Sequence, residues 1–145
     1  MKIEEIFSLW EIDSKIDIAS LEFESLKIPT LHYRYYKIYI SEKSRLMKFK
    51  SEYSSLRLEK IEFFTQGPTE ETDRKGWKLP PRGKIIKSDL EPYLQADQDL
   101  IKLSLQINVQ EEKLDLLKSI LDTIKQRSFH IREAIEFLKF QNNSH

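Results

Sequence analysis

Apolar residues between Asp97 and Phe140 recur at alternating steps of three and four, which places them on one face of an α-helix. This stretch contains neither proline nor glycine, so nothing in it forbids a continuous helix. The periodic positions are Leu100, Leu103, Ile107, Gln110, Leu114, Leu117, Leu121 and Ile124, and the pattern resumes at Ile131, Ile135 and Leu138. A second apolar set lies beside the first and comprises Leu105, Val109, Leu116 and Ile120. The pattern therefore predicts a long helix with neighbours on two sides.

The length of this helix bears on assembly. About 44 helical residues span about 66 Å, whereas a compact domain of this chain length is roughly 40 Å across. Either the helix breaks near Arg127 and Ser128, or copies of the chain cover the exposed seam. We expect the second outcome, a homo-oligomer. The residues predicted to form its contacts are Leu100, Leu103, Ile107, Leu114, Leu117, Leu121 and Ile124.

The rest of the chain also favours helices, within a single domain over residues 1–145. Residues 1–28 predict short N-terminal helices, the second one capped by Asp17 or Ser20. A long basic and aromatic helix is expected over residues 29–66, because Pro29 suits a first helical turn. Residues 67–88 predict a basic loop rich in glycine and proline, and residues 89–140 predict the long C-terminal oligomerisation helix.

The net charge of zero conceals blocks of like charge. Residues 1–28 carry 3 basic and 7 acidic side chains, residues 34–60 carry 8 basic and 3 acidic ones, and residues 74–87 carry six basic ones and no acid. Basic blocks suit a polyanionic partner, although solvated helix faces of alternating charge would give a similar composition. The absence of cysteine excludes disulfides and thiolate zinc sites. No apolar run is long enough for a membrane span, so we expect a cytoplasmic protein without membrane contact.

Catalytic constellations are hard to assemble from this sequence. Gly83 and Lys84 suggest a phosphate-binding loop, but Gly76 lies seven residues upstream of Gly83 instead of five, and Ile85 replaces the serine or threonine. The three histidines are far apart and form no pair with the spacing of metal ligands. We therefore expect no enzymatic activity, no cofactor and no metal.

Binding of nucleic acid has better support. Cations bind phosphates, and aromatic faces stack on bases, as in single-strand binders that do not read sequence. Tyr33, Tyr36, Tyr53, Phe63 and Phe64 accompany the basic residues of the long helix, although such aromatic residues also serve as core. The residues predicted to contact nucleic acid are Lys43, Arg45, Lys48, Lys50, Arg57, Lys60, Arg82, Lys84 and Lys87.

The sequence also resembles the UvsY family, the recombination mediator proteins of T-even-like phages and their marine relatives. The resemblance extends over nearly the whole chain. It rests on the segment from Glu24 to His32, the Gly76-Trp77 pair, and the run from Asp97 through Arg127-Ser128-Phe129-His130-Ile131-Arg132 to Phe140.

This resemblance implies an all-α subunit, built as a long-helix bundle or coiled coil, that assembles into a closed homo-oligomeric ring of about six or seven copies. It implies single-stranded DNA, the phage recombinase and the phage single-strand-binding protein as partners, in the cytoplasm of the infected host bacterium. Members are not enzymes and help to load the recombinase while the single-strand-binding protein leaves.

In the T-even member of the family, a DNA-binding motif pairs two basic residues, two positions apart, just before a double aromatic and a glycine. Phe63-Phe64 and Gly67 occupy the aromatic and glycine places, and Lys60 matches the second basic residue. Leu58 stands in the place of the first, which Arg57 or the second basic block would have to replace. The alternative function is a structural coiled-coil scaffold that has only protein partners.

Overall fold

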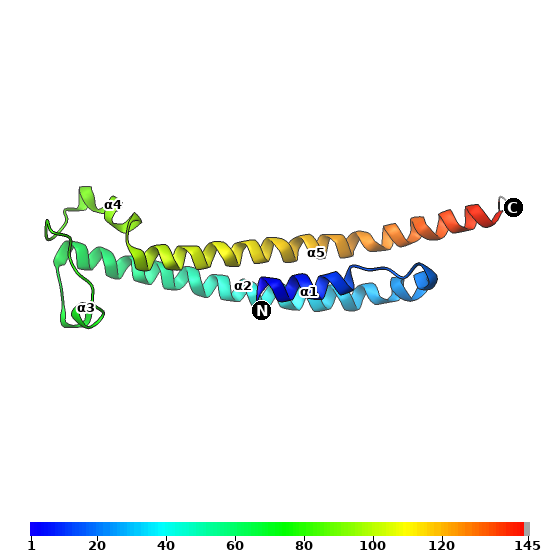
Figure 1. Ribbon diagram of the computed structural model, residues 1–145, viewed down its shortest axis with the longest axis horizontal. Helices are drawn as coiled ribbons and strands as arrows, with labels where there is room; N and C mark the ends of the chain where they lie inside the picture. Colours follow the sequence, from blue (N-terminus) through cyan, green and yellow to red (C-terminus); the bar gives the residue numbers. More distant parts are fainter. Residues whose placement is uncertain (144–145) are drawn as a thin grey trace. The chain divides into compact units, whose positions relative to one another are not determined.

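The protein is all-α, as the sequence predicts. The computed structural model describes residues 1–143, and these contain no β-strand. The helices in chain order are α1 (Ile3–Asp13), η1 (Ile18–Ser20), α2 (Leu21–Gln66), α3 (Glu70–Arg74), η2 (Lys87–Asp89), α4 (Leu90–Gln95) and α5 (Gln98–Asn143), where η marks a short 3₁₀ turn. Figure 1 shows the course of the chain through these elements.

Contacts within the chain divide it into two compact units. The first unit comprises residues 1–44 together with the part of the chain that begins at Glu111, and the second comprises residues 45–110. Helices α2 and α5 each contribute one part to each unit, whereas α1 belongs to the first unit and α3 and α4 belong to the second.

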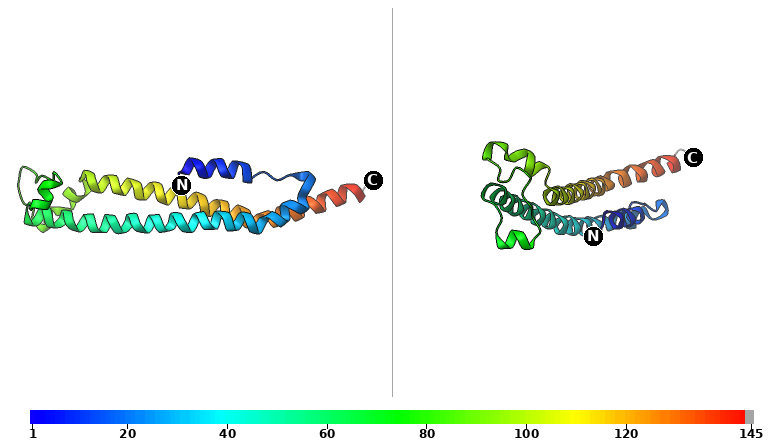
Figure 2. Two further views of the ribbon diagram at one scale, coloured as in Figure 1. Left: turned by 90° about the horizontal axis from the view of Figure 1, so that it is seen from below. Right: turned by 60° about the vertical axis from the view of Figure 1, so that its left-hand side comes forward.

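The core of the first unit forms where α1, the N-terminal part of α2 and the C-terminal part of α5 meet. In this unit α2 and α5 run antiparallel, and α1 lies alongside them (Figures 1 and 2). The buried apolar residues are Ile6 from α1, Leu21, Leu31 and Tyr35 from α2, and Leu114, Leu117, Ile120, Leu121, Ile124 and Ile131 from α5. Burial of these side chains supplies the main stabilisation of the unit, at about 1.5–3 kcal/mol for each large one.

Arg127 of α5 fastens the end of α1. Its guanidinium donates hydrogen bonds to the carbonyl oxygens of Asp13, at 2.8 Å, and Ser14, at 3.1 Å. It lies 5.6 Å from the ring centroid of Trp10. Because the carbonyl groups at a helix C-terminus lack partners within the helix, a buried cation there satisfies them and also complements the helix dipole.

Tyr35 of α2 completes this contact. Its hydroxyl donates a hydrogen bond of 2.8 Å to the carboxylate of Asp13, and its ring packs edge-on against Trp10. Burial and this hydrogen bond both raise the pKa of Tyr35 well above its usual value. The hydroxyl therefore stays protonated and keeps donating to Asp13 throughout the neutral range.

Charged side chains in the interior are paired. Glu42 of α2 accepts a hydrogen bond of 3.3 Å from the ammonium of Lys113 on α5, and both side chains are buried. Among the residues that the structure describes, no buried side-chain nitrogen or oxygen lacks a hydrogen-bond partner. Each buried charge is thus compensated, as a stable interior requires.

Helix α2 begins earlier than the sequence suggests. The structure places Pro29 inside one continuous helix from Leu21 to Gln66, not at the start of a separate third helix. A proline inside a helix removes one backbone hydrogen bond, here the one that would reach the carbonyl of Ser25. Ser25 and Pro29 are both exposed, so solvent can satisfy that carbonyl, while the buried side chains of Leu21 and Leu31 hold the helix on either side.

The seam assigned to oligomer contacts is largely covered by the chain itself. Of the seven residues, Leu100 is buried in the second unit, Leu114, Leu117, Leu121 and Ile124 are buried in the first, and Leu103 and Ile107 are partly buried. Helix α5 also continues through Arg127 and Ser128 without a break. A heptad pattern looks the same whether the facing helix belongs to another copy or, as here for the five buried positions, to the same chain.

Leu117→Ala tests this assignment. The side chain of Leu117 is 0% exposed, so its truncation should leave a cavity and lower the free energy of unfolding by about 2–5 kcal/mol, measured by urea denaturation. Lys118→Ala is the control at the next position of the same helix, because that residue is exposed and truncation of its side chain should cost less than about 1 kcal/mol. Full stability of the Leu117 variant, combined with a smaller assembly, would instead show that this residue contacts a second copy.

Candidate nucleic-acid interface

The second unit carries the basic loop at the end of α2. Gly67 ends the helix with a φ of 97°, and its amide donates to the carbonyl of Phe63 at 2.9 Å. Residues with such a φ are usually glycine, since a side chain there is strained. The amide of Ile85 then donates to the carbonyl of Phe64 at 2.8 Å, which attaches the second half of the loop to the helix end.

The aromatic pair of the motif is core. Phe63 and Phe64 are both buried and form a cluster with Ile85, Leu90, Leu94 and Leu100. Trp77 packs edge-on against Phe63 with ring centroids 5.6 Å apart, and Tyr93 of α4 lies 6.3 Å from Phe64. The two phenylalanines therefore do not offer faces to a nucleic acid but support the loop and α4.

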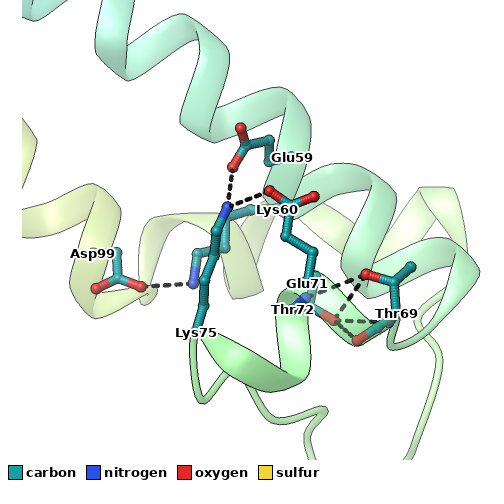
Figure 3. Close-up of polar contacts among 7 residues, drawn as sticks. All are labelled: Glu59, Lys60, Thr69, Glu71, Thr72, Lys75 and Asp99. Atoms are coloured by element: carbon teal, nitrogen blue, oxygen red, sulfur yellow. Dashed lines mark hydrogen bonds and ion pairs between the residues drawn. The ribbon is translucent and has the colours of Figure 1, made fainter.

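Lys60 is buried beneath the same loop. Its side chain lies in the interior, with the residue 4% exposed. Its ammonium makes ion pairs with Asp97 at 3.1 Å and with Asp99 at 2.8 Å, and it lies 3.8 Å from the ring centroid of Trp77 (Figure 3 shows the pair with Asp99). These three partners enclose the charge, so Lys60 serves to join α2, the loop and the start of α5. The structure thus gives a structural role to a residue predicted to contact phosphate.

Asp97 also caps the N-terminus of α5. Its carboxylate accepts a hydrogen bond of 3.0 Å from the amide of Leu100 in the first turn of α5. An aspartate in this position accepts a hydrogen bond from an amide that lacks a partner within the helix. Its negative charge also interacts favourably with the positive end of the helix dipole. The Lys60 pair therefore also fixes where α5 begins.

Arg57 is a partly exposed neighbour of α4. Its guanidinium makes an ion pair of 2.9 Å with Glu91, whose side chain is largely exposed. Leu58, which takes the place of the first basic residue of the motif, is exposed. A pair so accessible to water contributes little to stability, and a phosphate can compete for Arg57.

Lys75, at the end of α3, forms ion pairs with two acidic residues. It makes ion pairs with Glu59 at 3.2 Å and with Glu71 of α3 at 3.6 Å (Figure 3). The hydrogen bond to Glu59 raises the pKa of Lys75. Helices α3 and α4 lie on opposite sides of the end of α2 (Figures 1 and 2). The carboxylates of Glu59 and Glu71 therefore neutralise the charge of Lys75, although this lysine belongs to the most basic stretch of the chain.

The other residues predicted to contact nucleic acid are exposed cations on the loop and along α2. On the loop, Arg82, Lys84 and Lys87 are exposed, and only Arg82 has an ion-pair partner among the described residues, Asp89 at 3.4 Å. Lys84 and Lys87 border a shallow groove of about 480 Å³ together with Ile61 and Thr65 of α2. Of the predicted residues on α2, Arg45, Lys48 and Lys50 are exposed in the second unit and Lys43 is exposed in the first.

The arrangement of exposed cations on the loop can bind a polyanion. Residues 1–143 contain no group of three or more side chains placed to hold a metal ion. None of the described helices is both long and apolar enough to cross a lipid bilayer. The exposed lysines could be predicted from composition alone, whereas the pairing of Lys60 depends on Asp97 and Asp99, which are distant in the chain.

Comparison with known proteins gives the family and the fold. Residues 9–144 match the model of the UvsY family, described as recombination, repair and single-stranded-DNA-binding protein UvsY. Among curated protein sequences, none matches this chain. One crystal structure of the recombination mediator protein UvsY of bacteriophage T4 is 18% identical, with a TM-score of 0.78 over 97% of this chain and 99% of that chain. A second crystal form of it is 21% identical, with a TM-score of 0.79 over 98% of each chain. At these identities the structures establish the shared fold.

Lys60→Met tests the structural role of the buried lysine. Methionine keeps most of the apolar stem but leaves Asp97 and Asp99 without their cation, so the free energy of unfolding should fall by about 2 kcal/mol or more. Lys48→Met, at an exposed position of the same helix, should change it by less than about 0.5 kcal/mol. Urea denaturation measures both. A Lys60 variant of undiminished stability that fails to bind oligonucleotides would return this lysine to the phosphate contacts.

Proposed function

The chain belongs to the UvsY family of recombination, repair and single-stranded-DNA-binding proteins, and on this basis we propose that it is a recombination mediator of a phage. In this proposal it binds single-stranded DNA without sequence preference, promotes loading of the phage recombinase and helps to displace the phage single-strand-binding protein. It acts in the cytoplasm of the infected host bacterium. No bond is made or broken, and no cofactor takes part.

The observation that carries the proposal is the outward placement of the loop cations. Arg82, Lys84 and Lys87 project from a segment that the buried Phe64 holds by its backbone, so their charges are displayed on a supported surface. Lysine and arginine bind the phosphate backbone without reading base identity. This agrees with a mediator, which has to act on any sequence.

Lys84→Gln/Lys87→Gln tests the phosphate contacts. We expect weaker binding of a fluorescent single-stranded oligonucleotide and a smaller salt dependence, measured by anisotropy at several salt concentrations. The slope of log K against log salt should fall by about 1.4 for each engaged subunit, since a single strand gives about 0.7 for each contact. Lys118→Gln/Lys125→Gln makes the same change of charge at exposed positions of α5 and should leave both quantities nearly unchanged.

The same measurement separates the alternative. A structural scaffold with protein partners alone would show no oligonucleotide binding, or binding without salt dependence, in the unsubstituted protein. Either result would contradict the proposed function.

A closed homo-oligomer of about six or seven copies is part of the proposal. Several subunits then present cations to one strand, and weak contacts add through multivalency. Because the buried seam of α5 is used within the chain, the apolar positions left for association are the exposed ones. On α5 these include Leu105, Val109, Phe129, Phe137 and Phe140.

Leu105→Asp/Val109→Asp tests which residues hold the copies together. Charges at these exposed positions should lower the native mass of the assembly, measured by light scattering, without lowering the urea midpoint of the monomeric fold. Lys118→Asp, at an exposed and already polar position, is the control. A native mass equal to one chain in the unsubstituted protein would refute the oligomer.

A further inference from the structure

Three aromatic rings form a row along the N-terminal part of α2. The ring of His32 stacks on that of Tyr36 with centroids 5.8 Å apart and planes inclined by 13°. Tyr36 stacks on Tyr39 with centroids 6.3 Å apart and planes inclined by 29°. Residues four and three positions apart lie on one face of a helix, so the row follows the helix axis within the first unit.

This row is not part of the core. The buried face of α2 in this unit is defined by Leu31, Tyr35 and Glu42, and Tyr35 is 0% exposed. Tyr36 is rotated by about 100° from Tyr35 around the helix and is 48% exposed. Tyr36 therefore does not fill the interior, and its ring remains half-exposed to solvent.

On α2 itself, the neighbours of the row include the exposed Lys37 and Lys43 but no exposed acid. From residue 25 to residue 44, α2 contains a single acid, Glu42, which is buried and paired with Lys113. Lys43 lies one turn beyond Tyr39 on the same face and is exposed, and it has no ion-pair partner among the residues that the structure describes. An exposed cation that is available to bind an anion therefore adjoins the end of the row.

We propose that His32, Tyr36 and Tyr39 form a base-stacking surface for single-stranded nucleic acid, with Lys43 as the adjoining phosphate contact. The inference rests on the proposed function and adds to it a second kind of contact. Aromatic faces stack on any base, and stacking needs no sequence preference. Bases in a duplex are already stacked and paired, so a row of rings selects unpaired strands, which phosphate contacts alone do not distinguish.

A nucleic-acid strand fits this surface better than a second copy of the chain. An apolar partner helix would bury Tyr36 but would also have to accommodate the unpaired ammonium of Lys43. A strand offers a base to the rings and a phosphate to the lysine at neighbouring positions. Complementarity of charge therefore favours the strand.

The experiment compares two oligonucleotides of equal length and charge, oligothymidylate and the same backbone without bases. The unsubstituted protein should bind oligothymidylate at least about fivefold more tightly, which is the low end of the effect of one stacked base. Tyr36→Leu keeps an apolar side chain but removes the middle ring, so this preference should be lost while the slope against salt stays the same. Tyr36→Phe keeps the ring and should keep the preference.

Tyr33→Leu is the matched control. Tyr33 is a tyrosine of the same helix and is more exposed than Tyr36, but it lies outside the row, and its substitution should preserve the preference. Lys84→Gln/Lys87→Gln should weaken binding of both oligonucleotides and leave their ratio unchanged.

Three outcomes with the variants would overturn the inference. The preference for bases would persist in Tyr36→Leu, or Tyr33→Leu would abolish it equally, or the native mass of the Tyr36→Leu assembly would fall, which would assign the rings to a second copy. If the unsubstituted protein binds both oligonucleotides equally and with strong salt dependence, the stacking surface fails but the proposed function stands. If it binds neither, the proposed function fails as well.

Discussion

The ion pairs of Lys60 with Asp97 and Asp99 connect the end of α2 to the start of α5 inside the second unit. Burial of an ammonium is costly unless carboxylates surround it. The ion pairs therefore hold the segment that carries Lys60 against the segment that carries the two aspartates. Trp77 lies over the same ammonium, and Phe63 lies against Trp77. The position of the basic loop follows from this cluster, because Trp77 belongs to the loop and the amide of Ile85 bonds to the carbonyl of Phe64, beside Phe63.

The same constraint explains why the cations of this chain divide into two classes. Lys60, Lys113 and Arg127 are enclosed by carboxylates or backbone carbonyls and join helices to one another. Lys84 and Lys87 carry the same charge but remain exposed to solvent. The first class contributes to stability and the second is available to a polyanion. Basic composition alone does not separate them, since burial and pairing decide the role of each side chain.

A mediator of the proposed kind benefits from contacts that are weak and repeated. In the proposed binding mode, phosphate contacts on the loop give affinity that salt can modulate, and stacking on the rings of α2 gives a preference for unpaired bases. Neither contact reads sequence. In an assembly of several copies, such contacts add without the need for a deep binding cleft, and each can be released separately when another protein takes over the strand.

The sequence by itself determined α5, because its periodicity and its lack of glycine and proline are local properties. It predicted the end of α2 at Gly67, the long α5, and the basic character of the loop. It also pointed to the family through residues spread over the whole chain. What it could not give is which helix faces which.

Tertiary structure alone decided that the seam through Leu117 and Ile124 is covered within the chain, since a heptad pattern carries no record of whether its partner helix is the same molecule. It also decided that Lys60 is buried, because its carboxylates lie about forty residues away and only folding brings them together. The continuation of α2 through Pro29 has the same origin: packing on both sides of the proline outweighs its local preference to begin a helix.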